Sequence, residues 1–186
     1  MRKILFFGDS LTAGYGLAIP DRESFPALIQ KKIKESHLAY TVVNAGLSGD
    51  TSSGGLSRLE YWISTPIDIF ILELGINDVI RGLPTSSTYH NLDNILNRVR
   101  KKYPQCKIAI MGMEIPTLIS SSKIDEFRGL FGKLAELHQA TFVPFFLEGV
   151  MGVKHLNLRD GLHPSSKGYE IIADRVWPVV EQLLEA

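Results

Sequence analysis

Short apolar runs recur along the chain and predict a series of buried strands. They cover residues 4–7, 40–44, 67–74, 107–111 and 141–144. Several of these runs lack the regular polar alternation of a half-exposed strand, which is typical of parallel sheets covered on both faces.

Between these runs, apolar residues recur every three or four positions, with polar residues on the opposite side. This pattern predicts amphipathic helices over residues 23–36, 51–63, 87–103, 123–139 and 167–184. Strands and helices therefore alternate, which predicts an α/β fold, a three-layer α/β/α sandwich around a parallel sheet. At this length we expect a flavodoxin-like five-stranded sheet in the order 2-1-3-4-5 rather than an eight-fold barrel of about 250 residues.

Length and charge narrow the class of protein. The chain has 186 residues, with 20 Lys plus Arg and 20 Asp plus Glu. We expect a single domain over residues 1–186, with a monomer favoured. Balanced charge provides no field that would attract nucleic acid or an anionic membrane, so a small-molecule partner is expected. Cys106 is expected to be a buried filler, and no cluster of Cys and His suggests a zinc site.

The N-terminus carries no recognisable secretion signal. Only four apolar residues lie between Lys3 and Gly8, too few for the apolar region of a signal peptide. No apolar stretch elsewhere approaches the roughly 20 residues that span a bilayer. We therefore expect a cytoplasmic protein without a transmembrane segment, or a periplasmic or secreted one if a signal peptide has been removed.

Polar residues follow the predicted strands where each strand ends. Gly8-Asp9-Ser10-Leu11 comes after the first strand, Gly46-Leu47-Ser48-Gly49-Asp50 after the second and Gly75-Ile76-Asn77-Asp78 after the third. The carboxyl ends of parallel strands meet at the edge where such sheets bind ligands, so Ser10 should be presented there. A simpler interpretation is that Asp9 or Ser10 only caps a helix.

The turn Asp160-Gly161-Leu162-His163 supplies a base for this hydroxyl. An aspartate three residues before a histidine can hold Nδ1 and leave Nε2 free to take a proton from Ser10. In isolation, Asp160 could be only a turn former and His163 only a residue at a helix start.

An acyl-transfer site also needs donors aimed at the developing oxyanion. The backbone amides of Ser10 and Gly49 and the side-chain amide of Asn77 are the candidates, because glycine permits close approach and an amide donates without titrating. Gly49 and Asn77 could each be ordinary turn residues instead.

These four blocks, in this order, resemble those of the GDSL (SGNH) hydrolases, and the likeness extends over nearly the whole chain. Segments such as Ser48–Ser52 and Val143–Phe146 resemble the bacterial branch of thioesterase I, arylesterase and lysophospholipase. The resemblance implies Ser10 as nucleophile, His163 as base, Asp160 as the residue that orients the base, and Ser10, Gly49 and Asn77 as the oxyanion hole. It implies no metal or organic cofactor.

Two features depart from that branch and bear on the substrate. Ile76 stands where close relatives often have a second glycine, which would narrow or reshape the acyl site. The loop Pro116-Thr117-Leu118-Ile119-Ser120 lacks the Asn-Tyr-Gly run of that branch. Its Leu118 and Ile119 could instead form an apolar lip for an acyl chain, although an ordinary packed loop explains them equally well. Asp9 and Asp78 adjoin the catalytic positions, and we expect both to support them by hydrogen bonding.

The sequence therefore predicts a serine esterase that forms an acyl-Ser10 intermediate on carboxylic esters, and on acyl thioesters or lysophospholipids, with a medium-chain preference implied by the resemblance. The enzymatic alternative is a carbohydrate acetylesterase. The alternative outside enzymes is a flavodoxin-like module that binds phosphate or flavin, although this would leave the Asp160 and His163 spacing unexplained. Because the first block is not Gly-x-Ser-x-Gly, we expect Ser10 in an open loop without a strained elbow.

Overall fold

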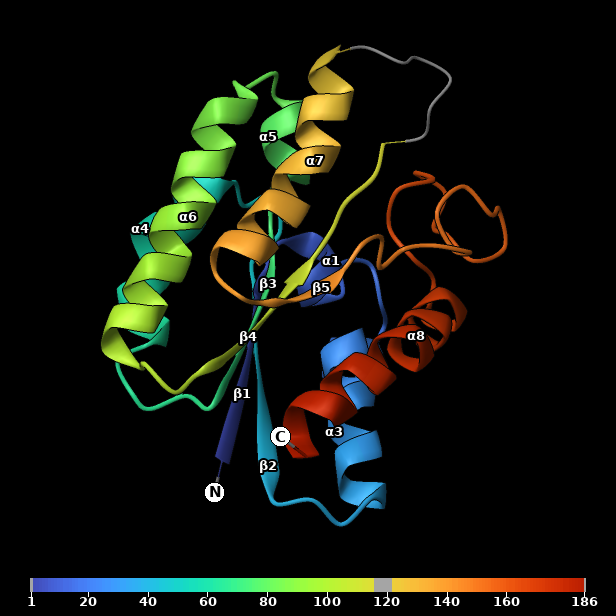
Figure 1. The fold of residues 1–186 in the computed structure, drawn as a ribbon. Coiled ribbons are helices and arrows are strands. Elements are labelled where there is room, and N and C mark those ends of the chain that lie inside the picture. The colour runs from blue at the N-terminus through green and yellow to red at the C-terminus, as the bar shows by residue number, and fades with distance from the viewer. Residues whose placement is uncertain (1, 116–121, 186) are drawn as a thin grey trace.

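The computed structural model describes residues 2–115 and 122–185, which contain a parallel sheet (Figure 1). Its strand order, β2-β1-β3-β4-β5, confirms the prediction. The strands are β1 (Arg2–Gly8), β2 (Tyr40–Gly46), β3 (Ile69–Glu73), β4 (Lys107–Met111) and β5 (Thr141–Val143). All four neighbouring pairs run parallel.

Helices cover both faces of the sheet, as predicted. Those in the described residues are α1 (Ser10–Ala13), α2 (Pro20–Glu23), α3 (Phe25–Glu35), α4 (Ser52–Trp62), α5 (Ile76–Ile80), α6 (Thr85–Lys102), α7 (Ser122–Leu137) and α8 (Ser166–Glu185). Helices α3 and α8 pack together on one face, and α4, α6 and α7 lie on the other (Figure 1). Every residue of β3 is buried between these two layers.

The sequence patterns missed the short helices. The helix expected over 23–36 is α3, and Ser24, whose ψ of 152° is extended rather than helical, separates it from the unexpected α2. Ser10 does not stand in a loop, so that expectation is wrong: it is the first residue of α1, because Asp9 Oδ1 accepts a hydrogen bond from Leu11 N and caps the helix. Helix α5 was likewise expected to be a turn.

Three further expectations concern Cys106, metals and membranes. Cys106 is buried, and burial raises the pKa of its thiol to about 12, as suits a packing residue. Within residues 2–115 and 122–185, no three His, Cys, Asp or Glu side chains are grouped so that they could hold a metal ion. In the same ranges, no helix is both long and apolar enough to cross a bilayer.

Candidate active site

Strand register brings the polar strand ends together. Gly8, at the end of β1, is opposite Gly46 on one side and Glu73 on the other. The segments that follow these three residues therefore start at the same edge of the sheet. This alignment places Ser10, Gly49 and Asn77 around one cavity.

Ser10, His163 and Asp160 form a continuous hydrogen-bonded series. Ser10 Oγ lies 2.9 Å from His163 Nε2, and His163 Nδ1 lies 2.7 Å from Asp160 Oδ2. Asp160 Oδ1 also accepts hydrogen bonds from the backbone amides of Leu162 and His163, at 2.9 Å and 3.0 Å. The aspartate thus holds both the turn and the ring of the histidine that follows it.

The charge of Asp160 is set by the same contacts. Partial burial acts to raise the pKa of this carboxyl, but hydrogen bonds from the backbone and ring of His163 and from Leu162 N outweigh it and hold the pKa below its usual value. Asp160 is therefore ionised at neutral pH. An ionised carboxylate at Nδ1 keeps the proton on that nitrogen, and Nε2 is left to accept the proton of Ser10.

The turn that presents Ser10 is capped rather than strained. In the described part of the chain, only His37 and Gln139 combine a side chain with a positive φ. Ser10 therefore lacks the left-handed backbone of a strained elbow, as expected. Asp9 holds the turn instead, since its side chain caps α1 while Ser10 is 8 % exposed at the helix start.

The three candidate donors of the oxyanion hole surround the site, but they differ in whether their N–H groups already have hydrogen-bond partners. Neither Ser10 N nor Gly49 N donates a hydrogen bond to another described residue, whereas the Gly49 carbonyl accepts one from Arg81 Nη2 at 2.6 Å. Asn77 Nδ2 donates to Asp50 O at 2.9 Å and to Asp9 Oδ2 at 3.1 Å. Both hydrogens of Asn77 therefore already have partners inside the protein.

The cavity at the nucleophile is small and largely apolar. Its volume is about 150 Å³. Its lining comprises Ser10, Leu11, Tyr15, Ser48, Gly49, Ile76, Asn77, Leu162 and His163. Ile76 is 7 % exposed and forms part of the wall. Leu118 and Ile119, the other predicted lip residues, lie outside the described residues.

Four buried carboxyl groups lie beneath the site. They belong to Asp9, Asp50, Glu73 and Asp78. Burial, followed among the raising effects by the charges of Asp50 and Asp78, raises the pKa of Asp9 to about 7, although hydrogen bonds from Leu11 N and Asn77 oppose the shift. Burial and the neighbouring Asp9 hold the pKa of Glu73 well above its usual value. Burial therefore favours the protonated forms of Asp9 and Glu73 relative to exposed carboxyl groups.

Asp9 and Asp78, which were expected to support the site by hydrogen bonding, both accept hydrogen bonds from neighbouring side chains. Asp9 Oδ2 accepts from Asn77, while Asp78 accepts from Ser52 N at 2.8 Å, Ser52 Oγ at 2.5 Å and Thr88 Oγ1 at 3.2 Å. Asp78 thereby connects α5, which carries Asn77, to the starts of α4 and α6.

Three residues at the site were not predicted. Arg58 donates from Nε to Asp50 Oδ2 at 2.7 Å and also to the carbonyls of Gly8 and Ala45, which ties the ends of β1 and β2 together. Glu73 was signalled only by its position as an acid within an apolar run. The third is Tyr15, whose ring lies on His163. These contacts join segments that are separated in the chain, so a local sequence pattern does not predict them.

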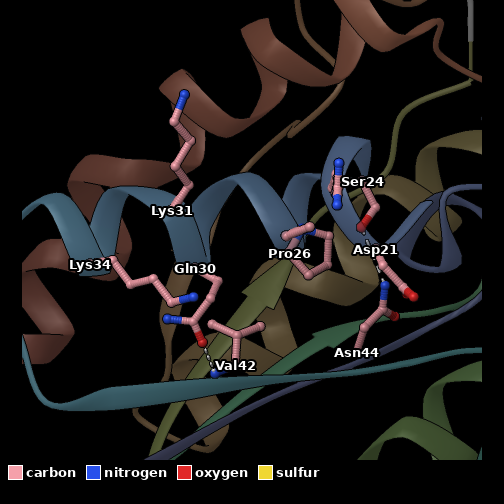
Figure 2. Close-up of a pocket in the computed structure, with 10 residues that line it drawn as sticks. Asp21, Ser24, Pro26, Gln30, Lys31, Lys34, Val42 and Asn44 are labelled. Carbon is pink, nitrogen blue, oxygen red and sulfur yellow. Dashed lines mark hydrogen bonds between the residues drawn. The ribbon is translucent and has the colours of Figure 1, made fainter. Parts of the chain in front are cut away.

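A larger cavity of about 580 Å³ lies elsewhere, between α3 and the edge strand β2 (Figure 2). There the Gln30 side chain accepts from Val42 N at 2.7 Å and donates to Tyr40 O at 3.3 Å. It thus satisfies backbone groups that an edge strand would otherwise offer to another chain.

Known proteins are similar to this chain over nearly its whole length. The model of the GDSL-like Lipase/Acylhydrolase family matches residues 6–171. Esterase TesA of Pseudomonas aeruginosa is 34 % identical over 97 % of this chain and 89 % of its own. Thioesterase 1/protease 1/lysophospholipase L1 of Escherichia coli is 33 % identical over 92 % of this chain and 79 % of its own. The crystal structure of the psychrotrophic esterase EstA from Pseudoalteromonas, inhibited by monoethylphosphonate, has a TM-score of 0.90 at 28 % identity and full coverage of both chains.

Proposed function

Because this chain belongs to the GDSL-like lipase/acylhydrolase family and is a serine esterase, we propose that it hydrolyses esters and thioesters through a covalent intermediate on Ser10. The observation that carries the assignment of residues is the unbroken series from Ser10 Oγ through the His163 ring to Asp160. A hydroxyl alone is a weak nucleophile, and an oriented base within hydrogen-bonding distance activates it.

Acylation begins when His163 Nε2 takes the Ser10 proton as Oγ bonds to the acyl carbon. The carbonyl π electrons move to oxygen and form a tetrahedral oxyanion. When the carbonyl re-forms, the bond to the alcohol or thiol breaks, and the imidazolium returns its proton to that leaving group. Water then repeats the sequence on acyl-Ser10, releasing a carboxylic acid and restoring the serine.

The oxyanion would be bound by Ser10 N, Gly49 N and Asn77 Nδ2. The two backbone amides are open to it. Asn77 would share with the oxyanion the hydrogen that now points to Asp9, since this contact is longer than the one to Asp50 O. Asp9 and Asp50 O accept hydrogen bonds and therefore keep the nitrogen of the Asn77 amide, rather than its oxygen, toward the hole. Asp9 and Asp78 act here as positioning residues.

The size of the cavity supports a short acyl group or a small aromatic one. About 150 Å³ is comparable to an engineered protein cavity that binds benzene. Ile76 is one of the apolar side chains that set this size. The described part of the site therefore favours shorter chains than the medium-chain preference implied by the sequence resemblance.

A chain-length series tests this function. We expect kcat/KM for p-nitrophenyl esters to be highest between acetate and hexanoate, and to be measurable for the corresponding acyl thioesters. Ile76→Ala should shift the preference toward octanoate, whereas Ile80→Ala, an exposed change on the same helix, should not. Hydrolysis restricted to acetylated sugars, or an unchanged profile in Ile76→Ala, would contradict the proposed substrate site.

A further inference from the structure

Tyr15 lies directly against the catalytic imidazole. The centroid of its ring is 4.6 Å from that of His163, and the ring planes are inclined by 47°. Yet Tyr15 is 51 % exposed. An aromatic side chain that is half in water gains less from burial than a core residue, so its placement on this ring calls for a specific explanation.

The backbone fixes Tyr15 relative to the nucleophile. The Ser10 carbonyl accepts hydrogen bonds from Gly14 N at 3.1 Å and from Tyr15 N at 3.0 Å. Gly14 and Gly16 flank the tyrosine with φ of 80° and 79°, a conformation that favours glycine. A Cβ on Gly16 would lie 2.3 Å from Leu158 Cδ1, on the segment that leads to His163. This turn therefore packs against the segment that carries the base.

His163 needs a contact of this kind. Its two hydrogen bonds, to Asp160 at Nδ1 and Ser10 at Nε2, hold the edges of the ring. Hydrogen bonds at the two nitrogens leave the ring able to rock about the line that joins them. A ring packed against the imidazole restricts this motion, and the Tyr15 ring lies within contact distance of it at an inclination of 47°.

We propose that Tyr15 is a positioning residue for the base: its ring holds the His163 imidazole in line with Ser10 Oγ and stabilises the imidazolium that forms during acylation. This inference rests on the proposed function of Ser10 and His163. The step is the transfer of the Ser10 proton to Nε2 as Oγ bonds to the acyl carbon, which leaves one positive charge on the imidazole beside the tyrosine ring. Aromatic rings stabilise adjacent cations, by an amount equivalent to about a 2- to 30-fold change in rate.

Two substitutions separate the ring from its hydroxyl. Tyr15→Phe keeps the ring, so we expect kcat within about 2-fold of wild type. Tyr15→Leu keeps apolar volume but removes the ring, and we expect kcat to fall about 3- to 30-fold with KM changed less than 3-fold. Tyr61→Leu, at the exposed end of α4, is the matched control and should leave both constants unchanged.

The contact also has a spectroscopic signature. In NMR spectra, the carbon-bound ring protons of His163 should be displaced by the ring current of Tyr15 in wild type and Tyr15→Phe, and should lose this displacement in Tyr15→Leu. Their assignment follows from the signals missing in His163→Ala. This readout does not depend on catalysis.

Several results would overturn the proposal. These are full kcat in Tyr15→Leu, an equal loss in Tyr15→Phe, a change confined to KM, or no NMR shift on removal of the ring. A failure of the function itself is distinguishable, because Ser10→Ala would then retain wild-type hydrolysis. If Ser10→Ala is inactive while Tyr15→Leu is unaffected, only the role of Tyr15 is refuted.

Discussion

Ser10 Oγ lies 2.9 Å from His163 Nε2, although 153 positions separate the two residues in the chain. Ser10 stands just after β1, which lies between β2 and β3 in the sheet, and His163 stands in the turn that precedes α8. Because Asp160 and His163 belong to the same turn, Asp160 can orient the His163 ring without a contact to the end of β1 that carries Ser10. The division of the site into these two parts leads to the following predictions.

Asp160→Asn should lower kcat by about 10²- to 10⁴-fold, because an amide does not hold the proton on His163 Nδ1 as a carboxylate does. Steady-state kinetics with a p-nitrophenyl ester will measure this loss. Asp174→Asn, which removes an exposed carboxylate paired with Lys32, serves as the control and should keep full activity. Retention of more than about a tenth of wild-type kcat in Asp160→Asn would show that the carboxylate does not orient the base.

Asn77→Ala should reduce kcat by about 10²- to 10³-fold with a small effect on KM, since an oxyanion-hole donor acts mainly in the transition state. Asn91→Ala offers a matched control, because Asn91 donates to Ser52 Oγ without lining the catalytic cavity. Circular dichroism should show that both variants are folded. A loss confined to KM would assign Asn77 to substrate binding instead.

Glu73→Gln should reduce the dependence of stability on pH. The raised pKa of Glu73 means that the folded protein binds this proton more tightly than the unfolded chain, so its stabilising contribution is present below pH 4.5 and is lost as pH rises. The pKa of Asp9 is raised from its ordinary value of 3.8 to about 7, so Asp9 also makes the folded protein less stable as pH rises through this range. The free energy of unfolding of wild type should therefore fall between pH 5 and pH 8, and that of the variant should fall less.

The design of this variant preserves the local hydrogen bonds. Glu73 Oε2 accepts from Thr12 Oγ1 at 2.7 Å and from Asp9 N at 3.3 Å, and a glutamine oxygen can accept both. Within the described residues, Glu73 Oε1 is buried without a partner. We expect kcat within about 3-fold of wild type. Urea unfolding at the two pH values provides the measurement, and equal pH dependence in both proteins would refute the protonation of Glu73.

The strands and the turn that joins Asp160 to His163 could be predicted because their signals are local. Apolar runs between turn residues defined all five strands, and the sheet then aligned the segments that carry Ser10, Gly49 and Asn77. The Asp160 and His163 spacing is also local, since both residues belong to one turn.

Other features could not be predicted, because they depend on contacts between segments or on helices too short to show a periodic pattern of apolar residues. Helix α1 has only four residues, too few to show a helical repeat. A helix cap at Asp9 and a functional contact of Ser10 therefore looked like alternatives, whereas Asp9 caps α1 and Ser10 Oγ also lies next to His163. The partners of Asn77 come from two other loops. The contact between Tyr15 and His163 joins the N-terminal turn to a segment near the C-terminus.

The most direct test of the central claim is covalent labelling with a fluorophosphonate, located by peptide mass spectrometry. The assignment predicts one adduct on the peptide that contains Ser10, no adduct in Ser10→Ala, and labelling slowed by at least about 10²-fold in His163→Ala. An adduct at another residue, or labelling of Ser10→Ala at the wild-type rate, would contradict the claim that Ser10 is the nucleophile.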